Sequence, residues 1–146
     1  MELYIGGFAQ GKTTYVMEKY KGCRLLFLQE GMYDAPDKTE ALEDVIVLQH
    51  FHLAVRGLLE GREVSAQATD EVYVQTWLEK LLAEIAKLER QGKKVLVISD
   101  EVGNGVVPME AFERVYRECV GRCLIRLATE AEKVERILCG MGQQIK

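Results

Sequence analysis

The octapeptide G-G-F-A-Q-G-K-T, residues 6–13, constrains this chain more than any other feature. It matches the nucleotide-binding pattern G-x-x-x-x-G-K-[ST] at every fixed position. A short apolar run, residues 3–5, precedes it, and residues 12–20 follow with helix formers and no breaker. A strand that enters a glycine-rich loop and leaves it as a helix is the setting of a phosphate-binding loop, or P-loop. A glycine-rich turn with an incidental lysine is the weaker interpretation.

Each residue type in this loop suits phosphate binding. Gly6 allows a tight turn out of the strand, and Gly11 lets the backbone approach phosphate oxygens without a Cβ clash. Successive N–H groups then form an anion site at the start of the following helix. Lys12 is predicted to reach the β- and γ-phosphates, and the Thr13 hydroxyl to bind Mg²⁺. The predicted nucleotide-binding residues are Gly6, Gly7, Phe8, Ala9, Gln10, Gly11, Lys12, Thr13 and Thr14.

Apolar runs alternate with amphipathic segments along the chain. We expect strands at residues 3–5, 24–28, 45–48, 95–98 and 134–139, and helices at 12–20, 49–59, 69–90 and 109–130. Residues 69–90 carry an apolar stripe that includes Val72 and Trp77, with an N-cap expected at residues 69–70. The alternation predicts an α/β protein of the P-loop nucleoside triphosphatase fold, with a mainly parallel sheet covered by helices on both faces. We expect one domain over residues 1–146.

Two acidic residues follow the most apolar predicted strand. Asp100 and Glu101 come directly after residues 95–98 and Ser99. P-loop enzymes need a carboxylate at such a strand end, so Asp100 is predicted to hold Mg²⁺ through water and Glu101 to orient or deprotonate an attacking hydroxyl. The alternative for either residue is capping of a turn. The other acidic candidates at strand ends are Asp34, Asp37 and Asp44.

The charge balance limits the partners that we expect. The chain has 19 basic and 23 acidic residues, interleaved, for a net charge of -4, which argues against binding to nucleic acid or an anionic membrane surface. No apolar run approaches the ~20 residues of a membrane span, and no signal peptide is recognisable, so we expect a cytoplasmic protein. The cysteines are predicted to be free and mostly buried, with a zinc site as the weaker alternative. They are Cys23, Cys119, Cys123 and Cys139.

The C-terminal half contains an unusual glycine-rich turn, E-V-G-N-G-V-V-P, at residues 101–108. It resembles the E-V-G-x-G-[IV]-V-P signature of the bifunctional adenosylcobinamide kinase/adenosylcobinamide-phosphate guanylyltransferase family of cobalamin biosynthesis. The closing residues 140–146 fit that family's G-x-x-x-x-[IL]-K tail. Further matching residues are Phe112, Arg114, Arg117, Gly121, Arg122, Leu127 and Ala128. The resemblance covers residues 95–146 well and residues 3–28 through the P-loop, whereas the middle matches poorly.

The resemblance implies a P-loop domain that assembles as a homo-oligomer, typically a trimer. It implies phosphorylation of the aminopropanol hydroxyl of adenosylcobinamide by GTP or ATP with Mg²⁺. It further implies transfer of GMP onto that phosphate through a guanylylated histidine. A corrinoid and a nucleotide would then be the small-molecule partners. The chain contains no N-K-x-D motif for guanine, so the choice of GTP rests on the resemblance alone.

The chain departs from the family pattern in three places. Residues 8–10 replace the middle of the usual G-G-x-R-S-G-K-S loop, with Thr13 in place of its serine. Asp100 stands where the family usually has asparagine. Full-size members carry several tens of additional residues between the second and third strands, including the helix with the guanylylated histidine. Only residues 31–43, without a histidine, stand there in this chain, so the guanylyltransferase step remains open.

Two histidines, His50 and His52, follow the third predicted strand and are candidate catalytic residues. Neutral imidazole is a competent phosphoramidate nucleophile. Two residues apart on a helix, they would point in different directions, so we expect at most one to face the phosphates. A packing or hydrogen-bonding role is the main alternative, ahead of ligand contact and of guanylylation.

Two further sets of side chains admit alternatives. Tyr73 and Trp77 are expected to pack in the core or between subunits rather than under a corrin ring. The arginines of the later helix are expected to form a solvated face with ion pairs, with phosphate binding as the alternative. They are Arg114, Arg117, Arg122 and Arg126. For the whole chain the alternatives to a cobinamide kinase are a nucleotide-binding regulatory protein that has lost transferase chemistry and a P-loop kinase for another small alcohol.

Overall fold

The computed structural model describes residues 1–31, 33, 44–60 and 67–146, with the backbone alone for residues 67–69. Within this part of the chain, six strands form one sheet in the order β2-β3-β4-β1-β5-β6. The strands are β1 (Glu2–Gly6), β2 (Leu25–Leu28), β3 (Val45–Leu48), β4 (Lys94–Asp100), β5 (Lys133–Leu138) and β6 (Met141–Gln144). The helices are α1 (Lys12–Lys19), α2 (Phe51–Leu59), α3 (Gln67–Arg90) and α4 (Ala111–Glu130). All neighbouring strands run parallel except β5 and β6.

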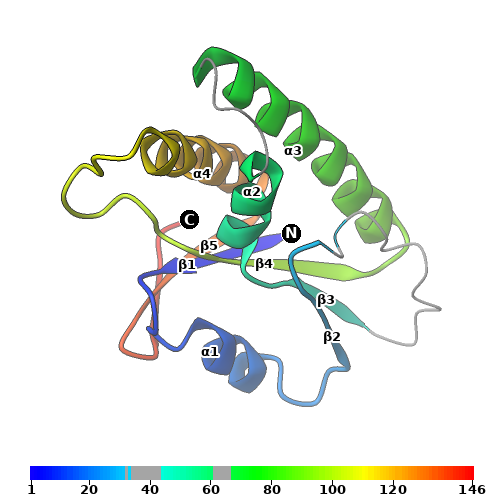
Figure 1. Ribbon diagram of the computed structural model, residues 1–146. Helices are drawn as coiled ribbons and strands as arrows, with labels where there is room; N and C mark the ends of the chain where they lie inside the picture. The colour runs from blue at the N-terminus through cyan, green and yellow to red at the C-terminus, as the bar shows by residue number, and fades with distance from the viewer. Residues whose placement is uncertain (32, 34–43, 61–66) are drawn as a thin grey trace.

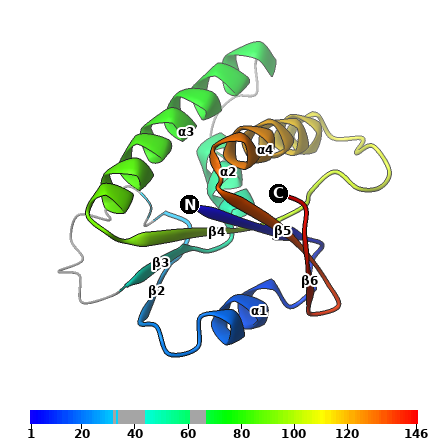
Figure 2. The same cartoon turned by 180° about the vertical axis from the view of Figure 1, so that it is seen from behind.

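Helices cover both faces of the sheet, as Figures 1 and 2 show. Helix α1 packs on one face over a small core that includes Tyr4, Val16 and Leu96. Helices α2, α3 and α4 cover the other face over a larger core, to which Phe51 and Leu78 belong. The predicted α/β fold, with a mainly parallel sheet between two helical layers, is confirmed.

The neighbouring strands β1 and β4 position the candidate site. Strand β4 is buried from Val95 to Ser99, which agrees with its continuously apolar sequence. The register pairs Gly6 with Asp100, so the glycine-rich loop and the predicted carboxylate leave the sheet side by side. Ligands of parallel sheets bind at this carboxyl edge.

The structure corrects several predicted elements. The sheet does not end with β5, because an antiparallel strand follows it; the exposed sequence M-G-Q-Q of β6 carries no apolar alternation that could have revealed it. Helix α3 begins at Gln67 rather than after a cap at residues 69–70, and Asp70 lies buried in its first turn. Val72 is 66% exposed, because the buried stripe of α3 starts at Val74, about half a turn away.

The acidic candidates Asp34 and Asp37 lie outside the described residues. Among the described helices, none combines the length and the apolar content that crossing a membrane requires.

Candidate nucleotide-binding site

The glycine-rich loop forms the floor of a cavity of about 480 Å³ at the carboxyl edge of the sheet. The residues lining it are Phe8, Ala9, Gln10, Gly11, Lys12, Thr13, Thr14, His50, His52, Leu53, Ile98, Ser99 and Asp100. The cavity therefore brings together most of the predicted loop, both candidate histidines and one of the two predicted carboxylates. Gly6, Gly7 and Glu101 are not among the lining residues.

The backbone of the loop has the shape expected of an anion site. Gly11, at the N-cap of α1, has a φ of 81°, and Ala9 has a φ of 57°, a conformation that glycine adopts far more readily than alanine. No described side chain caps α1, so its first N–H groups are free to meet a ligand. The left-handed turn and the uncapped helix start together make this end of the cavity suited to phosphate.

Lys12 is held at the base of the cavity with only 8% of its surface exposed. Its Nζ lies 2.5 Å from Asp100 Oδ1 and donates to the carbonyl oxygens of Gly7, at 2.7 Å, and Gly6, at 3.3 Å. A buried ammonium group needs such partners, because desolvation without them is costly. The sequence prediction that Lys12 and Asp100 serve the same site agrees with this geometry.

His52 contacts Asp100 at the backbone N–H and at the carboxylate oxygen that Lys12 does not pair with. Its Nδ1 accepts a hydrogen bond from the Asp100 backbone N–H at 3.1 Å, which leaves the proton on Nε2, 3.6 Å from Asp100 Oδ2. Burial lowers the pKa of His52, although the Asp100 carboxylate opposes that shift. The imidazole is therefore neutral at pH 7, and its lone pair is already engaged.

His50 reaches the cavity by a different route. It is the N-cap of α2 and has a φ of 59°, so it precedes the helix instead of lying within it. Both histidines line the cavity, with ring centroids 6.0 Å apart. The expectation that at most one of them faces the phosphates assumed helical geometry for both, and it stays a prediction.

The predicted metal ligands are oxygen donors of the right kind. The Thr13 hydroxyl and the Asp100 carboxylate both line the cavity, and Mg²⁺ prefers such hard oxygen ligands. Thr13 Oγ1 also accepts a hydrogen bond from Gln49 Nε2 at 2.9 Å. Gln49 was missed at the level of sequence; its place directly after β3, at the edge where ligands bind, was the one available signal.

Glu101 lies just beyond β4 and is engaged elsewhere. Its backbone N–H donates to the Gly6 carbonyl at 2.9 Å, and its Oε2 accepts from two nitrogens of Arg136 on β5, at 2.9 and 3.1 Å. The predicted contact of Glu101 with an attacking hydroxyl stays a prediction. Nothing in the sequence spacing pointed to Arg136 as its partner.

The remaining candidates lie away from the cavity. Asp44 pairs with Arg24 at 3.4 Å before β3, at the opposite edge of the sheet, and Asp34 and Asp37 lie outside the described residues. Trp77 packs against Phe51, with ring centroids 5.8 Å apart, whereas Tyr73 is partly exposed. Cys119 and Cys123 are buried thiols, Cys23 and Cys139 are exposed ones, and the described residues contain no cluster of three metal-binding side chains.

The arginines of α4 are occupied by protein groups. Arg122 pairs with Glu71 and Glu118, and Arg126 with Glu79 and Glu130, as expected for a solvated face. The other two bind backbone carbonyls of the preceding loop. Arg114 donates to Pro108 and Met109, and Arg117 to Val106. They thus fix the glycine-rich turn at residues 101–108 to the helix.

Comparison with known proteins gives a consistent result. A family described as cobinamide kinase / cobinamide phosphate guanyltransferase matches residues 28–145. The bifunctional adenosylcobalamin biosynthesis protein CobU of Salmonella typhimurium is 31% identical over 109 residues, which cover 73% of this chain and 60% of that protein. The Escherichia coli protein of the same name is 37% identical over 62 residues, 42% of this chain and 34% of the relative.

Two features of these matches bear on function. The chain spans at most about 60% of the length of the curated relatives it matches. The family match begins at residue 28, so the phosphate loop at residues 6–13 lies before it. The loop motif and the family match are therefore two separate observations.

Proposed function

The chain belongs to the cobinamide kinase / cobinamide phosphate guanyltransferase family, and from this membership we propose that it transfers the γ-phosphate of a nucleoside triphosphate to a hydroxyl of cobinamide. The observation that carries the proposal is the shared cavity of the phosphate loop, Lys12 and Asp100. A kinase needs a polyphosphate cradle, a cation and a positioned acceptor hydroxyl, and little else from the protein.

The residues take distinct parts in this reaction. The N–H groups at the start of α1 hold phosphate oxygens, and Lys12 leaves Asp100 to neutralise charge on the β- and γ-phosphates. Thr13 and Asp100, the latter through water, would hold Mg²⁺, which when bound neutralises the oxygens of the transferring group. The acceptor oxygen forms a bond to the γ-phosphorus as the bond to the β-phosphate oxygen breaks. A carboxylate takes the hydroxyl proton, and Asp100 is better placed for this than Glu101, which Arg136 engages.

A product assay tests the proposal against its rivals. Cobinamide and a panel of small alcohols are incubated with Mg²⁺ and GTP or ATP, and calorimetry measures nucleotide binding in parallel. Phosphorylated cobinamide is the expected product. Phosphorylation of another alcohol alone would identify a different kinase. Nucleotide binding without any product would identify a regulatory protein.

Guanylyl transfer is a second candidate because both histidines line the cavity. His50 is the better nucleophile of the two, since the lone pair of His52 accepts the Asp100 N–H. Labelled GTP should then leave an acid-labile, base-stable adduct in the wild type and the His52→Ala variant but not in the His50→Ala variant. A wild-type protein that forms no adduct would exclude a covalent histidine step.

We further propose that the chain is a single domain that assembles as a homo-oligomer, with the trimer typical of the family resemblance as the first expectation. Light scattering combined with size exclusion measures the molar mass directly. A monomer at micromolar concentration would overturn this part of the proposal without affecting the kinase assay.

A further inference from the structure

The turn between β5 and β6 lies directly beside the phosphate loop, as Figures 1 and 2 show from opposite sides. Two hydrogen bonds join them, and both end on Gln10. The Cys139 N–H donates to the Gln10 side-chain oxygen at 2.7 Å, and the Gly140 N–H donates to the Gln10 carbonyl at 2.9 Å. The loop is thus anchored at Gln10, between two residues with a left-handed backbone, Ala9 and Gly11.

Glycines make close contact possible along the whole boundary. A Cβ on Gly6 would lie 2.4 Å from the Ile137 carbonyl oxygen of β5, and one on Gly142 of β6 would lie 2.3 Å from the Tyr15 hydroxyl of α1. A Cβ on Gly11 would lie 3.4 Å from the Gly140 Cα. The strand before the loop, the loop itself and the helix after it therefore all rest against the same hairpin.

We infer that the β5–β6 hairpin holds the phosphate loop in its binding shape before a nucleotide arrives, with Gln10 as the positioning residue that joins the two. A free glycine-rich loop would lose conformational entropy on binding, and a loop that is already ordered binds more tightly. The left-handed φ at Ala9 needs such outside support, because it is unfavourable for alanine. The inference rests on the proposed role of the cavity in binding nucleotide.

The coupling must act in both directions. If the hairpin favours the binding shape of the loop, bound nucleotide must stabilise the hairpin by the same free energy. The amides of Cys139 and Gly140 donate to Gln10, so their hydrogen exchange reports the opening of this contact.

The test compares the Gln10→Ala variant with wild type and with the Gln143→Ala variant. Gln143 is an exposed glutamine of β6 that is not among the residues lining the cavity, so it controls for loss of a glutamine from the same region. Calorimetry with Mg²⁺-GTP and Mg²⁺-ATP gives affinity, and hydrogen exchange without nucleotide gives the opening of the Cys139 amide. We expect the Gln10→Ala variant to bind nucleotide about threefold to tenfold more weakly, which corresponds to the free energy of one hydrogen bond. The Cys139 amide should exchange its hydrogen faster in this variant than in wild type. Gln143→Ala should match wild type in both.

Both readouts must change together for the inference to stand. Weaker binding with unchanged exchange would mean that Gln10 touches the nucleotide directly. Faster exchange with unchanged affinity would mean that the hairpin does not preorganise the loop. Either result overturns the inference. Neither measurement uses an acceptor, so a protein that binds nucleotide but phosphorylates no cobinamide overturns only the proposed reaction. A wild-type protein that binds neither triphosphate overturns both.

Discussion

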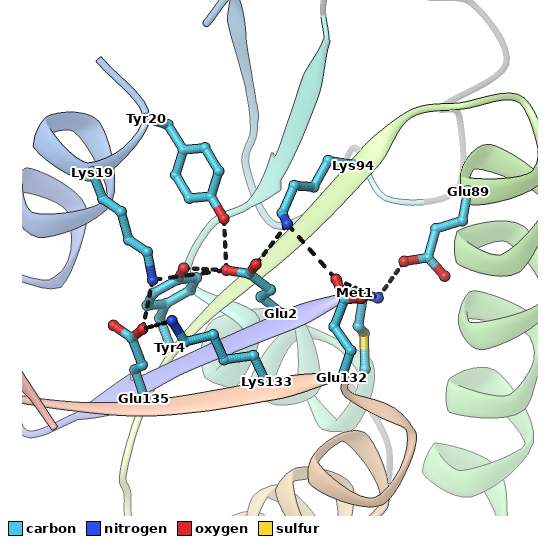
Figure 3. Close-up of polar contacts among 10 residues, drawn as sticks. All are labelled: Met1, Glu2, Tyr4, Lys19, Tyr20, Glu89, Lys94, Glu132, Lys133 and Glu135. Carbon is cyan, nitrogen blue, oxygen red and sulfur yellow. Dashed lines mark hydrogen bonds and ion pairs between the residues drawn. The ribbon is translucent and has the colours of Figure 1, made fainter. Parts of the chain in front are cut away.

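Helix α1 has charged groups at both ends, and the two ends differ in how those charges are paired. At its N-terminus, Lys12 borders the cavity and pairs with the Asp100 carboxylate. At its C-terminus, Lys19 and Tyr20 belong to a group of side chains around the buried carboxylates of Glu2 and Glu135, which we name the Glu2 cluster and which is drawn in Figure 3. The Glu2 cluster consists of Glu2, Tyr4, Lys19, Tyr20, Lys94, Lys133 and Glu135.

The Glu2 cluster pairs its charges within the protein. Glu2 contacts Lys94 and the Tyr20 hydroxyl, each at 2.6 Å, and the Tyr4 hydroxyl. Burial alone would raise the pKa of Glu2, but these hydrogen bonds outweigh it and hold the pKa at about 2. At Glu135, burial likewise acts to raise the pKa, and hydrogen bonds from lysines and Tyr15 lower it. The N-terminal end of α1 thus opens onto a cavity, whereas its C-terminal end joins a network of contacts within the protein.

The largest effect that this comparison predicts is on catalysis by the Lys12→Ala variant. The rate of phosphoryl transfer should fall on the order of 100- to 1,000-fold, as when other preorganised charge stabilisers are removed. The free energy of unfolding should change by about 1 kcal/mol or less. The Asp100 carboxylate that loses Lys12 borders the cavity, where water can reach it, and the hydrogen bond from the Asp100 N–H to His52 remains. Initial rates and urea unfolding measure the two quantities. A variant with wild-type turnover would show that the cavity is not the phosphate site.

The Glu2→Gln variant should show the opposite pattern. Neutralising the buried Glu2 carboxylate, which bonds Lys94 and two tyrosine hydroxyls, should destabilise the fold by about 3 kcal/mol. Triphosphate affinity should stay within about twofold, because the Glu2 cluster lies at the end of the strands opposite to the cavity. Glu132→Gln is the matched control, since Glu132 is exposed and contacts the same Lys94 at 3.7 Å. Equal losses of stability in both variants would mean that burial does not set the strength of these pairs.

The pH dependence of stability gives a second measure of the same residue. The pKa of Glu2 falls from 4.5 to about 2 on folding, so its contribution is fully present above pH 4.5 and is lost as pH falls toward 2. This shift corresponds to about 3 kcal/mol. Urea unfolding between pH 2 and 5 should show a shallower slope for Glu2→Gln than for wild type. Parallel curves would contradict a strongly lowered pKa.

Matched variants of His52 sharpen the comparison on the side of the cavity. Asparagine keeps an acceptor near the position of Nδ1, whereas glutamine places its amide near Nε2. If the bond from the Asp100 N–H is what positions the carboxylate, His52→Asn should stay within about threefold of wild type and His52→Gln should lose about tenfold in kcat. Equal losses would assign the effect to the contact between Nε2 and the carboxylate or to packing.

The sequence was most informative where function fixes the spacing of residues. The phosphate loop needs two glycines, a lysine and a hydroxyl at set positions, so the motif located the cavity. Asp100 followed from the rule that ligands meet the carboxyl ends of parallel strands. The bonds of Gln49 to Thr13 and of Arg136 to Glu101 could not be predicted in this way. They depend on the register of strands that are distant in the sequence.

The sequence was least informative where local backbone shape decides the outcome. His50 lies at a strand–helix junction with a left-handed φ that no periodic pattern encodes. Strand β6 has exposed residues and short length, so it lacks both signals of a strand. The contact of its hairpin with Gln10 consists of backbone donors, which every residue type except proline supplies.

The smallest effect is expected at Arg126, where charge pairs are exposed rather than buried. Its contacts with Glu79 and Glu130 resemble those of the Glu2 cluster in geometry but not in environment, since water competes for each group. The Arg126→Ala variant should therefore change the melting temperature by less than about 2 °C and leave phosphoryl transfer unchanged. Calorimetric unfolding and initial rates test both statements. A lower rate of phosphoryl transfer with an unchanged melting temperature would instead support the alternative in which an arginine of α4 binds phosphate. The ligand site would then extend beyond the cavity.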